Sequence, residues 1–234
     1  MTLRSRAVWL LRVVLAVQAA WLVLNGVILH HSPGLDPLGA VIAGCIAVFT
    51  VGYRRWAWTT VLVRVVMAAD FLLAVADRFG LLGPPGSPGV SWGDFTHFVT
   101  YTRSVAAFTP ASWAPTLAVA ATAAELSIGV ALLLGARLRL AALAAAALLA
   151  VYGISMSISL PPAQQFHYNV FLLCAAMLAL SFLDSPLSID RLLQRRQLRT
   201  VQRGDRRPVA TMSGQPIRTD VPRRTACHGR EPVG

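Results

Sequence analysis

The sequence predicts an all-α fold, a polytopic bundle of transmembrane helices with six spans. Two observations lead to this prediction. Hydrophobic residues make up 56% of the chain and gather in six long apolar runs. The arginines fall almost entirely in alternate connections between those runs, as the positive-inside rule for membrane proteins requires. These two patterns limit the function of the protein more than any single motif does.

The lengths of the runs support the spans. A hydrocarbon core of about 30 Å is crossed by about 20 helical residues, at about 1.5 Å per residue. Four runs reach that length, whereas the second and the sixth have 16 residues each and would need little tilt or a locally thinned bilayer. Six crossings is the prediction, within a range of four to six. The runs are residues 7–29, 38–53, 56–76, 113–136, 140–160 and 168–183.

The orientation follows from the arginines, because the chain contains no lysine. With the amino terminus inside, eighteen arginines are cytoplasmic, Arg78 and Arg103 are outside, and Arg64 falls within a span. This bias predicts a multi-pass protein with both termini in the cytoplasm. The Ala- and Arg-rich composition is typical of a GC-rich bacterial genome, so we expect the bacterial inner membrane. The topology also explains the net charge of +11, and we expect no nucleic-acid partner.

Three parts are predicted along the chain. Residues 1–55 form a transmembrane hairpin whose first helix is not cleaved as a signal peptide, because its apolar run continues past the small residues at 17–19. Residues 56–184 form a four-helix membrane domain with an outer loop at 80–112. Residues 185–234 form a basic cytoplasmic tail. Its residues 189–199 suit a short helix on anionic lipid, and the composition beyond Gly204 predicts disorder.

The outer loop contains a predicted interfacial helix. Its residues 83–89 are rich in Gly and Pro and cannot be helical. Ser91 with Asp94 three residues later resembles a capping box that begins a helix. Apolar residues then recur at helical spacing, while Asp94, His97 and Tyr101 share the opposite face. This helix is either a plain connector at the outer membrane surface or a lid over a cavity between the spans.

Ionisable residues inside the predicted spans are the sharper clue to function. Asp70 and Glu125 fall near the middle of the membrane, where an unpaired charge costs about 3 kcal/mol on insertion scales. At about 100° per residue, Asp70 and Asp77 share one face of their span, and Arg64 and Arg78 share a neighbouring face. We expect Glu125 to pair with Arg64 or Arg78. The pair either fixes the packing of the helices or handles protons or a ligand.

Several motifs occur in one order along residues 56–184. Residues 76–80 read Ala-Asp-Arg-Phe-Gly, 92–98 read Trp-Gly-Asp-Phe-Thr-His-Phe, 121–125 read Ala-Thr-Ala-Ala-Glu, and 168–171 read Tyr-Asn-Val-Phe. Together they resemble the DoxX-like family of small bacterial integral membrane proteins. That family has a four-helix domain, and some members are named as subunits of quinol- or thiosulfate-linked oxidoreductase systems. The hairpin at 1–55 and the lead into the last helix at 161–167 depart from the family pattern.

The predicted site is a cavity near the outer side of the bundle. Asp77 and Glu125 would accept protons, and Arg78 would hold them ionised or bind an anionic or quinone oxygen. His97 and Tyr101 would donate hydrogen bonds from the lid. Quinone is the one cofactor that the resemblance suggests, and no metal site is predicted because no helical pair of histidines occurs. The candidate cavity or proton-handling residues are Asp70, Asp77, Arg78, His97, Tyr101, Glu125, Tyr168 and Asn169.

Three functions remain open at this point, and none of them assigns a catalytic residue. The resemblance implies a membrane subunit of a quinone-linked redox system without electron carriers of its own, working with peripheral or membrane oxidoreductase subunits. The basic tail suggests instead a scaffold or assembly partner for a peripheral protein. Asp70 and Glu125 suggest a small proton-coupled transporter, although no inverted repeat is visible in the sequence.

The orientation can be tested with single cysteines in a chain whose own three cysteines are replaced by serine. Thiols at Ser87 or Gln164 should react with a membrane-impermeant maleimide added outside the cell. A thiol at Gly204 should react only after the membrane is permeabilised. Reaction at Gly204 in intact cells would reverse the predicted orientation.

Overall fold

The structure is a computed structural model, and it describes residues 3–25, 37–161 and 163–183. Every regular element in these ranges is a helix. The predicted tail helix at 189–199 and the predicted disorder beyond Gly204 lie outside the described residues. The all-α prediction is therefore confirmed for the part of the chain that the structure covers.

Four helices are long and apolar enough to cross a membrane. They are α1 (Leu3–Val23), α3 (Trp58–Arg78), α5 (Ala114–Leu134) and α6 (Leu138–Ser159). The remaining elements are α2 (Pro37–Gly52), α4 (Phe95–Val105), the 3-10 turn η2 (Ala111–Trp113), α7 (Ala163–His167) and α8 (Val170–Ser181). The helices α2 and α8 are apolar but shorter, so among the described residues length and composition support four spans, and the six that were predicted are not confirmed.

The last helix is shorter than its apolar run. The sequence predicts a span over residues 168–183, but α8 has only 12 residues. Asn169 adopts the left-handed conformation at φ 52°, which breaks the helical path directly before Val170. The residues before this break form the separate short helix α7, which the sequence analysis did not predict.

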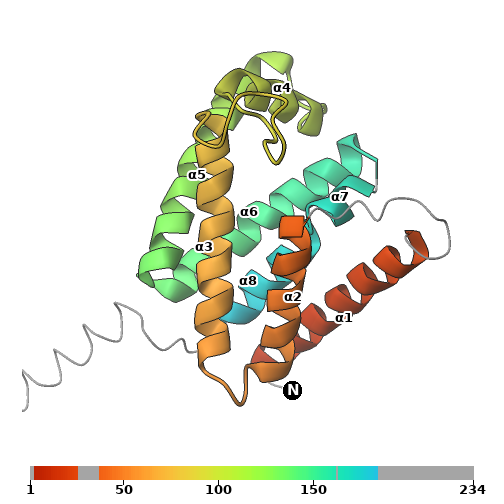
Figure 1. The fold of residues 1–234 in the computed structure, drawn as a ribbon, viewed down its shortest axis with the longest axis vertical. Coiled ribbons are helices and arrows are strands. Elements are labelled where there is room, and N and C mark those ends of the chain that lie inside the picture. The colour runs from red at the N-terminus through yellow and green to blue at the C-terminus, as the bar shows by residue number, and fades with distance from the viewer. Residues whose placement is uncertain (1–2, 26–36, 162, 184–234) are drawn as a thin grey trace, which may run out of the picture. The chain divides into compact units, whose positions relative to one another are not determined.

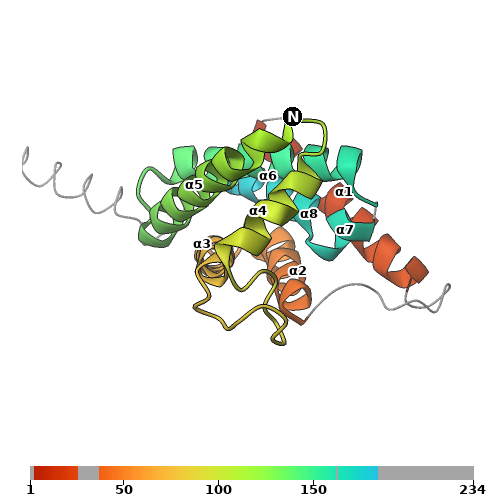
Figure 2. The same ribbon diagram turned by 90° about the horizontal axis from the view of Figure 1, so that it is seen from above.

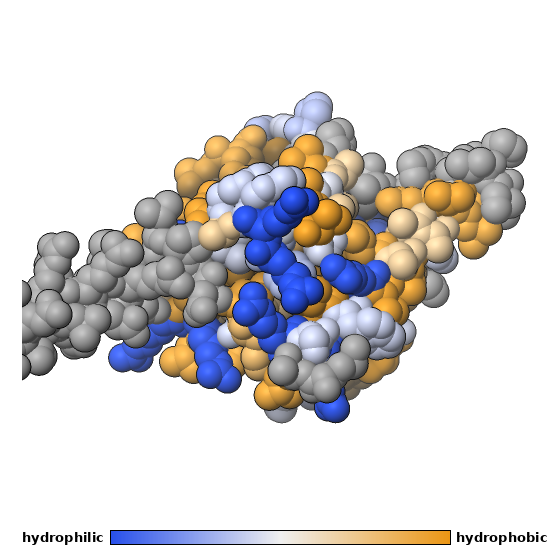
Figure 3. All heavy atoms as spheres, turned by 90° about the horizontal axis from the view of Figure 1, so that it is seen from below, coloured by the Kyte–Doolittle hydropathy of each residue, from blue (hydrophilic) through white to orange (hydrophobic). Residues whose placement is uncertain are grey.

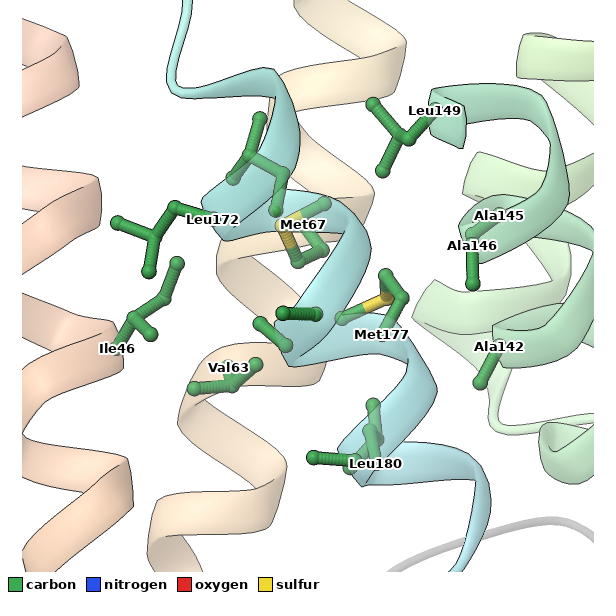
Figure 4. Packing of buried hydrophobic residues seen from close by; sticks show 14 of the residues in the cluster. Ile46, Val63, Met67, Ala142, Ala145, Ala146, Leu149, Leu172, Met177 and Leu180 are labelled. Atoms are coloured by element: carbon green, nitrogen blue, oxygen red, sulfur yellow. The ribbon is translucent and has the colours of Figure 1, made fainter. Parts of the chain in front are cut away.

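The helix α8 lies in the middle of the bundle. Its neighbours are α1, α3 and α6, and side chains from α2, α3 and α6 converge on it in Figure 4. Alanines on α6 face it, and such small residues let two helix backbones approach closely. Gly153 of α6 is part of this contact, because a Cβ atom there would lie 2.7 Å from the ring of Phe171. Nine of the twelve residues of α8 are buried.

The arginine-bearing ends of the helices meet at one end of the bundle. Figure 1 shows the α2–α3 and α5–α6 turns at the end opposite α4, together with the start of α1. Arg4 lies over the ring of Tyr53 at 5.9 Å, and Arg139 lies over the ring of Phe182 at 5.9 Å. The face seen from this side carries a hydrophilic patch bordered by apolar side chains (Figure 3). This is the end that the arginine count predicts to be cytoplasmic.

Exposed aromatic rings mark both ends of α3. Trp58 at its start is 53% exposed, and Phe79 directly after its end is 61% exposed. The helix, which begins at Trp58 and ends directly before Phe79, has 21 residues. At about 1.5 Å per residue its length matches a hydrocarbon core of about 30 Å. Aromatic side chains are enriched at the two membrane interfaces. The spacing therefore fits α3 to a full crossing with little tilt.

The helix α4 lies across the end of the bundle opposite the arginine-bearing turns (Figure 2), which we call the outer end after the predicted orientation. The capping box predicted from Ser91 is wrong, because Asp94 itself is the N-cap and its carboxylate accepts the N–H of His97 at 2.8 Å. Gly93, at φ 72°, turns the chain immediately before it, so the helix cannot start earlier. The buried side chain of α4 is Phe98, and Tyr101 and Val105 pack against the core.

Candidate functional site

A buried ion pair joins α3 to α5. Arg78, in the last turn of α3, is 3% exposed, and Glu125 in the middle of α5 is 2% exposed. One guanidinium nitrogen, Nη2, donates to Glu125 Oε2 at 2.6 Å, and Nη1 donates to Thr122 Oγ1 at 3.0 Å. Of the two arginines that the sequence offered, Arg78 is therefore the partner of Glu125.

The same carboxylate also binds α6. The hydroxyl of Tyr152 donates to Glu125 Oε1 at 2.6 Å, so both carboxylate oxygens have a donor. We call Arg78, Thr122, Glu125 and Tyr152 the Arg78 cluster. Sequence analysis missed Tyr152, although a phenol within the Ala- and Leu-rich run at 140–160 was a usable signal, because a buried hydroxyl needs a partner.

Aromatic rings of the outer elements cover Arg78. Its guanidinium lies 3.7 Å from the ring centroid of Phe98 on α4 and 5.2 Å from that of Trp92 in the preceding loop. A cation over an aromatic face is attracted by about 1 to 2 kcal/mol where both are removed from water. One guanidinium thus contacts α4, the outer loop and α5 at the same time.

The neighbouring Asp77 organises the outer loop. Its carboxylate accepts the backbone N–H groups of Ser91 at 2.9 Å, Trp92 at 3.1 Å and Gly93 at 3.2 Å. Charge-assisted hydrogen bonds of this kind are about twice as strong as neutral ones. Gly93 is required here, since a Cβ atom would come within 2.4 Å of Pro85 N. Asp77 was predicted to accept protons in a cavity, and in the structure its oxygens hold the loop.

A second group of polar residues consists of Tyr101 on α4 and the consecutive Tyr168 and Asn169 before α8. The ring of Tyr101 is 6.5 Å from that of Tyr168 and 5.8 Å from that of Trp92, which also contacts Arg78. Asn169 is 2% exposed and donates from Nδ2 to the carbonyl oxygen of Gly39 on α2 at 3.2 Å. Its Oδ1 has no hydrogen-bond partner among the described residues. We call Tyr101, Tyr168 and Asn169 the Asn169 cluster.

Ionisation differs between the buried and the exposed side chains of α4. Burial raises the pKa of Tyr101 far above its usual range, so its hydroxyl remains protonated at neutral pH. The backbone N–H of His97 lowers the pKa of the Asp94 carboxyl. A carboxyl group whose pKa is lowered by folding stabilises the fold at pH values above the usual pKa of Asp. This contribution is lost as the pH falls from that value through the lowered pKa.

Three predicted site residues lie outside both clusters, and Asp77 is the one that holds the loop before α4. His97 is on the exposed side of α4, with 60% of its side chain accessible and its Nδ1 2.8 Å from Asp94 Oδ2. Asp70 is half-buried on α3, two helical turns before Asp77. The structure thus brings together Arg78 and Glu125 in one cluster, and Tyr101, Tyr168 and Asn169 form the other, whereas the carboxylate of Asp77 binds the loop.

Comparisons with known proteins gave no relative. No protein-family model, no curated protein and no solved structure matches the chain significantly. Within the described ranges, no group of three or more His, Cys, Asp or Glu side chains could hold a metal ion. The Arg78 and Asn169 clusters are therefore the basis for assigning a function.

The Arg78 cluster should be sensitive to the charge of Glu125. Glu125→Leu leaves a buried guanidinium unpaired and should lower the stability by about 3 to 5 kcal/mol, measured as thermal unfolding in detergent. Glu125→Gln keeps one acceptor oxygen and should cost less. Ser127→Leu is the control, because Ser127 is exposed on the same helix and its hydroxyl donates to the carbonyl oxygen of Ala123, one turn earlier in α5. Equal small losses for both Glu125 variants would contradict the ion pair.

The three hydrogen bonds to Asp77 should hold the loop independently of the ion pair. Asp77→Asn replaces one acceptor oxygen by a donor that faces backbone N–H groups. Hydrogen exchange at residues 91–93 should then accelerate about tenfold or more, because a bond to a charged group contributes about 1.5 to 3 kcal/mol. Asp94→Asn, the control, should affect only the first turn of α4. Unchanged exchange at 91–93 in the Asp77 variant would contradict this function of the carboxylate.

Proposed function

We propose that the protein is a DoxX-like membrane subunit of a quinone-linked redox system, in which it binds the quinone and a partner subunit supplies the electron carriers. The observation that carries the proposal is the buried Oδ1 of Asn169, which lacks a partner among the described residues. A buried acceptor of this kind requires a donor or a functional explanation. A quinol hydroxyl is such a donor, and the ring of the preceding residue, Tyr168, lies 6.5 Å from that of Tyr101 and offers a flat apolar surface.

The chemistry of the Asn169 cluster serves both redox states of a quinone. Tyr101 remains protonated at neutral pH and can therefore donate to a quinone carbonyl. Asn169 Oδ1 can accept from the hydroxyl of the reduced form. A proton released on quinol oxidation would need an acceptor nearby. Glu125 is too closely engaged by Arg78 and Tyr152 to serve as that acceptor in this conformation.

The depth of the cluster favours a lipophilic ligand. Phe182, directly after the end of α8, contacts Arg139. The end of α8 therefore lies at the predicted cytoplasmic end of the bundle. Twelve residues at about 1.5 Å each place Asn169 about 20 Å from that end, inside a hydrocarbon core of about 30 Å. A quinone dissolves in the bilayer and can reach this depth from the lipid.

A second candidate function is favoured by the predicted cytoplasmic end. The seven arginines of the described residues at this end, from Arg4 to Arg139, have no acidic side chain among them, because the described acids are Asp70, Asp77, Asp94 and Glu125. Figure 3 shows the resulting hydrophilic patch. Such a surface suits an acidic peripheral protein, which would make the chain an assembly partner.

Quinone extracted from the purified protein tests the first proposal. The wild-type protein should carry a near-stoichiometric quinone, and Asn169→Gly should reduce it about tenfold, as expected for one lost hydrogen bond. Glycine accepts the left-handed backbone at this position, so the variant leaves the turn in place and removes the amide group, that is, the acceptor Oδ1 and the Nδ2 bond to Gly39. Arg137→Gly is the matched control, since Arg137 also has a positive φ, 43°, but lies at the opposite end.

The same purification distinguishes the two candidates. Quinone loss in the Asn169 variant with full retention in the Arg137 variant supports the redox subunit. Absence of quinone from the wild-type protein, with a stoichiometric acidic protein that dissociates in 0.5 M salt, would replace it by the assembly function.

A further inference from the structure

A pocket of about 380 Å³ opens on the side of the bundle, away from the Asn169 cluster. It lies where the end of α3, the start of α4 and the outer half of α5 meet. Val119 is 57% exposed and Leu126 is 46% exposed, so the pocket opens on the lipid-facing surface of α5. Its walls are Phe79, Phe95, Val119, Thr122, Ala123 and Leu126.

The membrane determines what can fill this pocket. At this position the surroundings are hydrocarbon, so an apolar hollow is occupied by lipophilic groups rather than by water. The rings of Phe79 and Phe95 are stacked with their centroids 6.3 Å apart and form one wall near the outer interface. From Val119 to Leu126 the pocket follows two turns of α5, about 10 Å toward the centre of the membrane.

The hydrogen bonds of Thr122 select the chemical class of the occupant. Thr122 is the one polar residue of the lining. Its hydroxyl already donates to the carbonyl oxygen of Ala118 at 2.8 Å and accepts from Arg78 Nη1 at 3.0 Å. No hydrogen is left for a ring carbonyl, whose burial without a donor is costly. A plain hydrocarbon chain needs no such partner.

We propose that this pocket binds one acyl chain of an outer-leaflet phospholipid. The proposal does not rest on the quinone link, because it concerns a different surface and a ligand without hydrogen-bonding groups in the pocket. The bound chain contacts α3, α4 and α5, the same elements that Arg78 joins. Lipid bound only in this arrangement stabilises it by mass action, and so keeps α4 closed over the bundle.

Photochemical labelling tests the assignment. The protein is reconstituted into nanodiscs of phosphatidylcholine that contain a phosphatidylcholine with a diazirine on one acyl chain, irradiated, and digested for mass spectrometry. Label on Val119 and Leu126 should exceed label on Val130 and Leu133 at least threefold. The latter two are lipid-facing residues of the same helix outside the pocket. Even labelling along α5 would overturn the proposal and indicate ordinary contact with bulk lipid.

A filled pocket provides the matched comparison. Ala123→Trp should reduce label on Val119 and Leu126 to the level of Val130, whereas Val130→Trp should leave the pocket label unchanged. If Ala123→Trp does not fold, the wild-type labelling pattern and the smaller change Ala123→Leu decide the question. Loss of the acyl label from the wild-type pocket on addition of one equivalent of a long-chain isoprenoid quinone would overturn the phospholipid assignment.

Discussion

The buried positive charge of Arg78 is the interaction on which the outer half of this structure depends. A guanidinium in a hydrocarbon environment must be neutralised and its N–H groups must be bonded, because both requirements cost several kcal/mol if unmet. Glu125 neutralises the charge and, with Thr122, binds the two terminal nitrogens from α5, while Arg78 Nε has no hydrogen-bond partner among the described residues. Tyr152 of α6 binds the other oxygen of the same carboxylate. The position of the Arg78 side chain along the bundle axis therefore determines how far α3, α5 and α6 are shifted relative to one another along their axes.

Asp77 and Arg78 hold two different parts of the structure at the outer end. Asp77 and Arg78 are consecutive at the end of α3, about 100° apart around the helix, so their side chains leave in different directions. The carboxylate orders the loop that leads into α4, and the guanidinium lies beneath Phe98 of α4 itself. The amphipathic helix is thus fixed at its approach and at its underside. A connector without such contacts would be free to leave the bundle.

The sequence predicted what depends on apolar length and on the cost of charge in a membrane. The all-helical membrane bundle and the pairing of Glu125 with an arginine followed from those two terms, whereas the number of spans did not, since six were predicted and four helices are long enough. The cap at Asp94, the hydrogen bonds to Asp77 and the short helix α7 did not, because they depend on where the backbone turns. The positive φ of Gly93 and that of Asn169 make those turns, and neither leaves a mark in a hydropathy pattern. Tyr152 was missed because its partner lies on another helix, 27 positions away in sequence.

The shortness of α8 has a consequence for how the protein is made. A segment of 12 apolar residues is too short to be stable as an independent helix in a bilayer, and it is the last described helix to leave the ribosome. Its place lies between α1, α3 and α6, which are synthesised earlier. The earlier helices must therefore associate first and leave a gap between them. Lipid fills this gap until α8 is inserted. Insertion of α8 among the earlier helices is a folding step rather than a membrane-partitioning step, so the described bundle is complete only when α8 has been added.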